Sequence, residues 1–251
     1  MELNICHLYP DILNLYGDRG NILCMRKRLA WRGIDVNVDE VSIGQKLEAS
    51  KYDLLFIGGG QDFEQEVLLP DLRGAKTEEL KAAIEDNLPV LAICGGYQML
   101  GRTVSDPEQV EAAGVTEING LGLLEMDTEF RGEKVQTQTQ GVFHGVEGML
   151  SGLNGLAYEG YEIHMGRSQQ QMPALTGSRN VYGSYVHGIF DAPGITDTIL
   201  KALCAKKGVS FDALATFDAC GYKERQYDLL ADVVRGGLDM SFVYRVLRRE
   251  V

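Results

Sequence analysis

The stretch "LPVLAICGGYQMLG", residues 88–101, joins an apolar run to a cysteine and two glycines. The run is typical of a buried strand, and the residues after it are typical of a helix. Cys94 would then occupy a sharp strand-to-helix turn, which the small Gly95 and Gly96 allow to form. A helix N-terminus favours a thiolate, and its first N–H groups are free to bind an oxyanion. The stretch therefore predicts a nucleophilic cysteine, with a small buried thiol as the alternative.

Strand and helix patterns alternate over the first hundred residues. Strands are expected at 3–9, 33–41, 52–60 and 89–93, and helices at 20–32, 77–87 and from residue 95 onward. This alternation predicts a mostly parallel sheet with helices on both faces, where ligands bind beyond the carboxyl ends of the strands. The glycine run 58–60 and Cys94 both follow such strand ends.

The pattern changes from residue 119 onward. Alternating apolar and polar residues predict antiparallel strands within 119–143 and further strands at 156–167 and 180–191. Helices are expected at 196–208 and 224–239, the latter continuing through 240–249. With no linker or repeat in the chain, we expect one α/β domain with a mixed sheet over residues 1–251.

Composition narrows the function classes. The net charge of −12 disfavours nucleic acid and anionic membranes as partners. Five cysteines without CxxC or zinc-ligand spacing indicate a reducing compartment and no metal site. Without a signal peptide or a long apolar run, the chain is expected to be cytoplasmic and to lack a membrane span. Basic residues in 25–33 and 244–250 indicate solvated helix faces or a docking face for an acidic partner.

A nucleophilic cysteine also needs a base. His187, in "YVHGIF", follows a predicted strand and is followed by a glycine, so its side chain could reach the same cleft. His164, in "YEIHMG", is the competing candidate, and the residues alone leave both open.

These motifs together resemble a known family. "AICGGYQMLG", with "IGGGQD" before it and "YVHGIFD" after it, resembles the class I glutamine amidotransferases, although Ala92 replaces the first glycine of their nucleophile motif. "YEIHMGR" and "YDLLADVVR" narrow the resemblance to the cobyric acid synthase-like (CobB/CobQ) branch. "ICHLYPDILNLYGDRGNI" and the chain length are similar to the GatD type, the glutaminase subunit of lipid II isoglutaminyl synthase. The resemblance implies a flavodoxin-like α/β fold with a central, mostly parallel mixed sheet flanked by helices.

The resemblance also implies a role for each motif residue. Cys94 would attack the side-chain amide of glutamine, and His187 would shuttle the proton to ammonia. Gly60 and Gly95 would stabilise the oxyanion, and Gln98 would help to hold the substrate. The residues themselves suggest Arg131 as a partner for the glutamine α-carboxylate, with an ordinary surface arginine as the alternative.

One departure concerns the group that orients the base. Class I enzymes carry His-x-Glu, but Gly188 and Ile189 follow His187, as in the cobyric acid synthase-like branch. Glu162 and Asp191 are carboxylates that could take the place of this glutamate, but only their residue type supports either of them. The orienting group therefore stays open at this point.

The fate of the ammonia points to a partner. The chain has no G-x-x-x-x-G-K-[ST] phosphate loop, so no cofactor is expected in it. The resemblance implies a heterodimer with a Mur ligase-like (MurT type) synthetase subunit that uses ATP and Mg to amidate the D-glutamate α-carboxylate of lipid II to D-isoglutamine, in peptidoglycan biosynthesis. That complex would work at the inner face of the membrane.

Three hypotheses follow. The first is a glutaminase subunit of this or another amidating synthase. The second is a stand-alone cysteine hydrolase acting on γ-glutamyl compounds. The third is a non-enzymatic partner-binding protein, which the intact set of Cys94, Gly95, Gln98 and His187 argues against.

Overall fold

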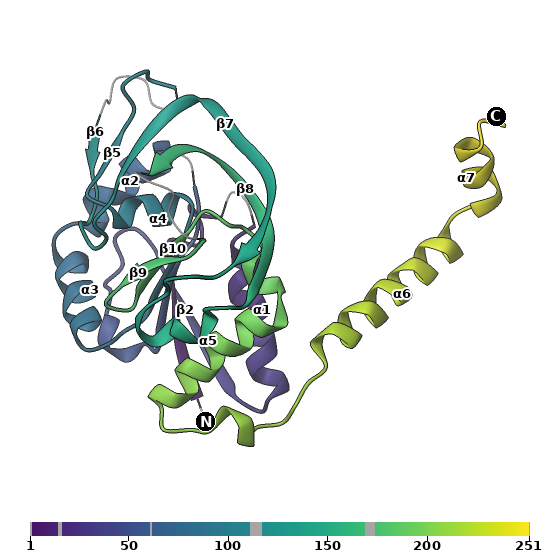
Figure 1. Cartoon of the computed structure of the whole chain (residues 1–251), viewed down its shortest axis with the longest axis horizontal. Helices are drawn as coiled ribbons and strands as arrows, with labels where there is room; N and C mark the ends of the chain where they lie inside the picture. The colour runs from purple at the N-terminus through teal and green to yellow at the C-terminus, as the bar shows by residue number, and fades with distance from the viewer. Residues whose placement is uncertain (1, 15–16, 61, 111–116, 169–173, 251) are drawn as a thin grey trace. The chain divides into compact units, whose positions relative to one another are not determined.

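The computed structural model describes residues 2–14, 17–60, 62–110, 117–168 and 174–250 (Figure 1). Its contacts separate two compact units, Met1–Ala215 and Thr216–Val251. The single domain expected over 1–251 stays a prediction. Within the described part of the chain, no helix is both long and apolar enough to cross a bilayer.

A six-stranded sheet forms the centre of the first unit. Its order is β2-β1-β3-β4-β10-β9, and every neighbouring pair is parallel except β9 and β10. The strands are β1 (Glu2–Leu8), β2 (Asp35–Val41), β3 (Leu54–Ile57), β4 (Val90–Ile93), β9 (Thr176–Ser178) and β10 (Val181–Ser184). The mostly parallel mixed sheet expected from the alternating pattern is confirmed.

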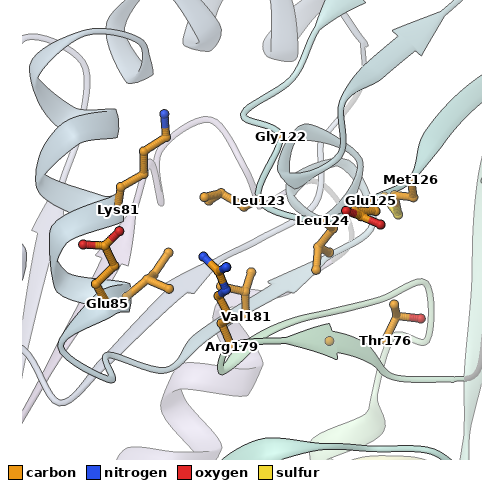
Figure 2. Close-up of a pocket in the computed structure, with 12 residues that line it drawn as sticks. Lys81, Glu85, Gly122, Leu123, Leu124, Glu125, Met126, Thr176, Arg179 and Val181 are labelled. Atoms are coloured by element: carbon orange, nitrogen blue, oxygen red, sulfur yellow. The ribbon is translucent and has the colours of Figure 1, made fainter.

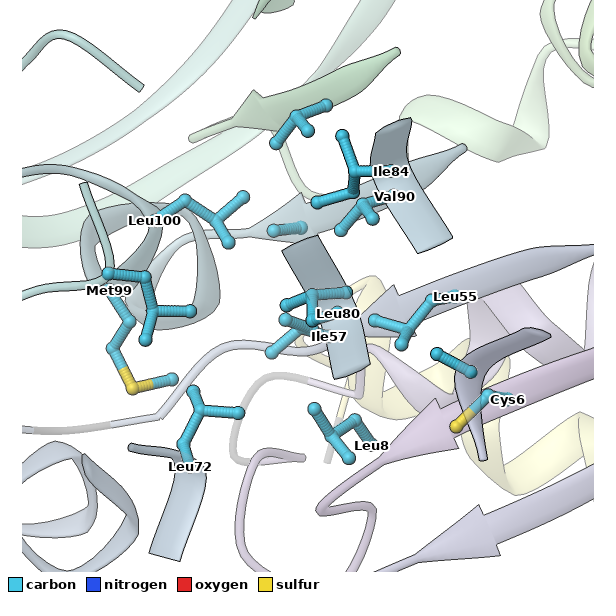
Figure 3. Close-up of a cluster of buried hydrophobic side chains, with 14 of the residues drawn as sticks. Cys6, Leu8, Leu55, Ile57, Leu72, Leu80, Ile84, Val90, Met99 and Leu100 are labelled. Atoms are coloured by element: carbon cyan, nitrogen blue, oxygen red, sulfur yellow. The ribbon is translucent and has the colours of Figure 1, made fainter. Parts of the chain in front are cut away.

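Helices cover both faces of this sheet. Side chains alternate along each strand, so one face packs against α2 (Asp62–Leu72), α3 (Ala75–Glu85) and α4 (Gly95–Leu100). The other face packs against α1 (Arg19–Trp31) and α5 (Pro193–Lys206). Figure 3 shows the first of these cores, in which Leu8, Ile57 and Val90 of the sheet meet Leu80 of α3 and Leu100 of α4. Burial on both faces explains why the central strands read as continuous apolar runs.

A second sheet follows the change of pattern near residue 119. It has the order β6-β5-β7-β8, with β6 (Glu117–Asn119), β5 (Thr103–Ser105), β7 (Asp127–Val142) and β8 (Ala157–Ser168). The antiparallel pairing of β7 and β8 is long and is interrupted by a register shift between Phe130 and Val135. The several antiparallel strands expected within 119–143 are therefore one long strand, β7, which is antiparallel to β8 and parallel to β5 in a sheet of its own.

The strand expected over 180–191 is shorter than predicted. β10 ends at Ser184, and a 3-10 helix covers Ile189–Asp191. Gly188 adopts a left-handed conformation (φ 76°), which turns the chain between the two. His187 therefore lies beyond the strand, in an isolated bridge with Tyr161.

The second unit consists of α6 (Ala219–Gly237) and α7 (Met240–Leu247). The helix expected to run on through 240–249 is interrupted at Leu238, which is extended (φ −118°, ψ 150°). Asp239 then caps α7 by accepting a hydrogen bond of 3.0 Å from the Phe242 N–H.

Candidate active site

Four adjacent strands end at one edge of the central sheet, and each is followed by a residue of the candidate site. Asp18 follows β1, the glycines 58–60 follow β3, Cys94 follows β4 and His187 follows β10. Because the carboxyl ends of parallel strands meet at the same edge, residues far apart in sequence converge there.

Cys94 occupies a strained turn. Its backbone has φ 49° and ψ −111°, a region that non-glycine residues rarely adopt and that costs about 1–3 kcal/mol. Its N–H donates to the Ser184 carbonyl at 2.8 Å, and its Sγ lies 3.8 Å from the Ile163 carbonyl oxygen. The side chain is 3% exposed and lies at the N-terminus of α4. The predicted strand-to-helix turn is therefore present.

The two glycine segments beside Cys94 are in direct contact. A Cβ atom on Gly95 would lie 2.6 Å from the carbonyl oxygen and 2.9 Å from the nitrogen of Gly60. The Gly96 N–H donates to the Gly58 carbonyl at 3.1 Å. Glycine is therefore required at positions 95 and 96, and the close approach brings together the two residues predicted to stabilise the oxyanion, Gly60 and Gly95.

His187 is hydrogen-bonded to Asp18. The His187 Nδ1 lies 3.1 Å from Oδ1 of Asp18, and the Gly59 N–H donates to Oδ2 of the same carboxylate at 2.7 Å. His187 is 1% exposed and Asp18 is 2% exposed. A carboxylate only accepts hydrogen bonds, so we assign the proton to Nδ1, which leaves Nε2 as the basic nitrogen. The Tyr161 ring stacks on the imidazole at a centroid distance of 5.2 Å.

Gly59 lies between this pair and the cysteine. A Cβ atom on Gly59 would lie 2.9 Å from Asp18 Oδ2 and also 2.9 Å from the Cys94 Cβ. Cys94 and the Asp18–His187 pair therefore flank one backbone position. This arrangement can serve a nucleophile, a base and a carboxylate that orients the base.

Asp18 is the residue of the candidate site that could not be identified from the sequence. The sequence signal, an aspartate just before an expected helix, is typical of an N-cap. Asp18 does occupy the N-cap position of α1, but its side chain makes no capping hydrogen bond. The buried carboxylate accepts from Gly59 and His187 instead. Neither substitute named from the sequence takes this place, because Glu162 bonds to His164 and Asp191 is exposed.

His164 is held by its own strand. Its Nδ1 lies 2.8 Å from the Gly166 carbonyl oxygen, and its Nε2 lies 3.2 Å from Glu162 Oε2. The hydrogen bond from His164 lowers the pKa of Glu162. Both ring nitrogens of His164 thus face oxygen atoms of its own strand, β8. The Nδ1 of His187 instead faces the buried carboxylate of Asp18, which belongs to another part of the chain. Between the two histidines, the geometry favours His187 as the base.

Gln98 and Arg131 have different surroundings. Gln98 is 2% exposed, and its Nε2 lies 3.4 Å from the Tyr185 hydroxyl, which is itself 2.7 Å from Ser168 Oγ. Arg131 is exposed in the irregular part of β7, and its Nε donates to Glu129 at 2.9 Å. Their substrate-binding roles stay predictions.

A separate cavity of about 600 Å³ lies away from Cys94 and His187. Figure 2 shows it between α3, the segment 122–126 and the start of β10, with Lys81, Glu85 and Arg179 at its border. Val181, the first residue of β10, belongs to its lining, so the cavity is near the amino end of that strand. In such sheets the carboxyl ends carry the ligand site, and Cys94 and His187 lie there.

The amino-acid sequence of this chain is similar to those of several named proteins. A cobyric acid synthase from Lachnoclostridium phytofermentans is 38% identical over 240 residues, which cover 86% of this chain and 46% of the relative. The GatD subunit of lipid II isoglutaminyl synthase from Staphylococcus aureus is 36% identical over 225 residues, which cover 84% of this chain and 88% of GatD. The chain thus spans less than half of the first relative and most of the second.

The fold and a family profile agree with these matches. The structure of PurLQS from Thermotoga maritima superposes with a TM-score of 0.52 at 14% identity, covering 82% of this chain and 100% of that chain, which shows a shared fold. The profile of the CobB/CobQ-like glutamine amidotransferase domain matches residues 4–195, which include the whole Asp18–Cys94–His187 cluster. The chain belongs to the CobB/CobQ-like glutamine amidotransferase family.

Proposed function

We propose that this chain hydrolyses L-glutamine to glutamate and ammonia, with Cys94 as nucleophile and His187 as the base that Asp18 orients. The observation that carries the proposal is the position of Cys94: a strained turn separated from the Asp18–His187 pair by a single glycine backbone. A positive φ at a non-glycine residue is tolerated where function requires it.

The reaction follows from the positions of these groups. The Cys94 Sγ adds to the amide carbon of glutamine, and the N–H groups of Gly60 and Gly95 bind the oxygen that becomes negative. His187 takes the thiol proton and gives it to the departing ammonia, which leaves a γ-glutamyl thioester. Water, deprotonated by His187, then releases glutamate and restores the thiol. Gln98 and Arg131 hold the substrate in this proposal.

The ammonia passes to a Mur ligase-like subunit of the MurT type in a heterodimer. That subunit binds ATP and Mg, and it amidates the D-glutamate α-carboxylate of lipid II to D-isoglutamine. The match to GatD supports this acceptor because it covers most of both chains. This chain carries no cofactor in the proposal, and the complex acts in the cytoplasm at the inner face of the membrane.

A second candidate is the glutaminase part of another amidating synthase. The 38% identity to a cobyric acid synthase favours it, since the same chemistry would supply ammonia to a different carboxylate. A stand-alone γ-glutamyl hydrolase would share the nucleophile but would turn over γ-glutamyl peptides instead of glutamine, without any partner.

Ammonia release separates these candidates. Wild type and Cys94→Ala are incubated with glutamine or a γ-glutamyl peptide, with and without the Mur ligase-like subunit, ATP and lipid II. The proposal predicts ammonia from glutamine, more of it with the subunit present, and amidated lipid II detected by mass spectrometry; Cys94→Ala gives neither. Ammonia release without amidated lipid II points to another synthase. Turnover of the γ-glutamyl peptide but not of glutamine supports the γ-glutamyl hydrolase. If no mixture releases ammonia, glutaminase activity is refuted.

A further inference from the structure

One aromatic ring covers the imidazole of the candidate base. The rings of Tyr161 and His187 are stacked, with a centroid distance of 5.2 Å and an interplanar angle of 16°. His187 is 1% exposed, whereas Tyr161 is 41% exposed. The tyrosine ring therefore lies outside the imidazole and separates it from solvent on that side.

The backbone holds the two rings together. The His187 N–H donates to the Tyr161 carbonyl at 2.8 Å, and the Tyr161 N–H donates to the His187 carbonyl at 3.1 Å, which makes the isolated antiparallel bridge. A glycine precedes Tyr161, and a Cβ atom on Gly160 would overlap the His187 carbonyl and lie 2.6 Å from Val186 Cγ1. The close approach of β8 to this segment, and with it the stack, therefore depends on the backbone as well as on the two rings.

The same part of β8 reaches both the base and the nucleophile. Two residues after Tyr161, the Ile163 carbonyl oxygen lies 3.8 Å from Cys94 Sγ. The neighbouring His164 stacks on Tyr185 instead, at a centroid distance of 4.0 Å. Tyr161 is thus the side chain that this strand places against the candidate base.

Asp18 and Tyr161 restrain the imidazole in different directions. The hydrogen bond from Nδ1 to the carboxylate lies in the plane of the ring, so it leaves the ring free to rotate about the axis of that bond. A stacked aromatic ring opposes this rotation, because the two faces attract each other when they are parallel and offset. The pair together therefore fixes the direction in which Nε2 points.

The stack also suits a positive charge on the imidazole. The face of a tyrosine ring is electron-rich, and it stabilises a cation that lies within about 6 Å of its centroid. Burial and the charges of Asp18 and Asp191 raise the pKa of Tyr161, so its phenol stays neutral beside the base. An imidazolium formed at His187 would meet this neutral face.

We propose that Tyr161 is a positioning residue for glutamine hydrolysis, whose ring restrains the His187 imidazole and stabilises the imidazolium that forms when Cys94 attacks. This role rests on the proposed function, in which His187 is the base. The face of the ring is the part that acts. Phenylalanine can therefore replace Tyr161, whereas an aliphatic side chain cannot.

The test compares three variants of the full-length chain. Tyr161→Leu removes the ring face, and Tyr161→Phe keeps it. Tyr158→Leu is the matched control, because it makes the same change on the same strand, where the ring packs on Phe143 at a centroid distance of 5.0 Å. Glutamate formation from glutamine is measured with the partner subunit present, and urea unfolding checks each fold. We expect kcat of Tyr161→Leu to fall about tenfold with KM changed less than about threefold, and the other two variants to stay within about threefold of wild type.

The pH profile separates this role from a purely structural one. The charged and titratable groups around the two rings are Asp18, His7, Arg19, Asp191 and Cys94. All of them stay in each variant, so a changed profile comes from the ring. Loss of the ring face favours the neutral imidazole, and the acidic limb of kcat/KM in Tyr161→Leu should move about 0.5 unit toward lower pH, with no such movement in Tyr161→Phe. NMR spectra of the protein with labelled histidine follow the same protonation of His187 without turnover.

Each other result has a defined meaning. A folded Tyr161→Leu with the kcat and the pH profile of wild type overturns the inference. So does an equal loss in Tyr161→Phe, which assigns the effect to the hydroxyl, or an equal loss in Tyr158→Leu, which assigns it to the packing of β8. If the wild type forms no glutamate, the proposed function fails. The NMR midpoint of His187 then decides whether the ring stabilises the imidazolium, and the same midpoint in all variants overturns the inference.

Discussion

Replacement of Asp18 by asparagine tests how the base is oriented. The carboxylate accepts hydrogen bonds from the Gly59 N–H at 2.7 Å and from His187 Nδ1 at 3.1 Å, with a longer one from Asn21 Nδ2 at 3.5 Å, and Asp18 is 2% exposed. An amide of the same shape has only one oxygen. If that oxygen faces Gly59, the NH₂ group faces Nδ1 and forces the imidazole into the wrong tautomer. If it faces His187, two donors oppose each other in a buried site.

Either orientation loses a hydrogen bond to a charged group, which is worth about 1.5–3 kcal/mol. The protonated imidazole that forms during the reaction also loses its counter-charge. In serine proteases the same change at the orienting carboxylate lowers kcat by about 10⁴. For Asp18→Asn we expect kcat to fall by about 10³, or about 4 kcal/mol, with KM changed by less than about threefold.

The assay is glutamate formation from glutamine in the presence of the partner subunit. Asp35→Asn is the matched control, because Asp35 is an exposed carboxylate at the start of β2. Urea unfolding shows whether the Asp18 variant keeps its fold. If kcat of Asp18→Asn stays within about tenfold of wild type while the protein is folded, Asp18 does not orient the base.

Three further substitutions have expected outcomes. Gly59→Ala should abolish glutaminase activity, since its Cβ would lie 2.9 Å from the Asp18 carboxylate, whereas Gly20→Ala, with open space around it, should keep full activity in the same assay. Burial lowers the pKa of His7 to about 4. The unfolded chain therefore binds a proton between pH 6.5 and 4 that the folded protein does not, and about 3 kcal/mol of stability is lost as pH falls through this window. Urea unfolding of His7→Gln should lack that loss, and an unchanged pH dependence would exclude His7 as its source. Tyr185→Phe removes a partly buried hydroxyl that is hydrogen-bonded to Gln98 and Ser168, and it should destabilise the fold by about 1 kcal/mol in urea unfolding; a change below about 0.3 kcal/mol would show that this network adds little.

The sequence was sufficient for the parts of the site that depend on local geometry. The strand-to-helix turn at Cys94 follows from an apolar run and two glycines, because few other residues permit such a turn. The contact between Gly60 and Gly95 follows from the neighbouring ends of parallel strands. His187 was identified as a candidate in the same way, although the strand before it is shorter than its apolar pattern predicts.

Asp18 could not be assigned in this way. Its local pattern describes a helix cap, and its actual partners lie 41 and 169 residues away along the chain. The choice between His187 and His164 likewise depended on which histidine meets a buried carboxylate from another element. Such pairings are fixed by tertiary packing, and a single sequence contains no periodic signal for them.

The central claim is that Cys94 attacks glutamine, and the covalent intermediate is its most direct test. The protein and its partner subunit are mixed with radiolabelled glutamine, quenched in acid within milliseconds, digested and analysed by mass spectrometry. We predict a γ-glutamyl thioester on Cys94, and its accumulation in variants with slowed hydrolysis of the thioester. Steady-state formation of glutamate with no label on the peptide that contains Cys94, or with label on another cysteine, would contradict the account.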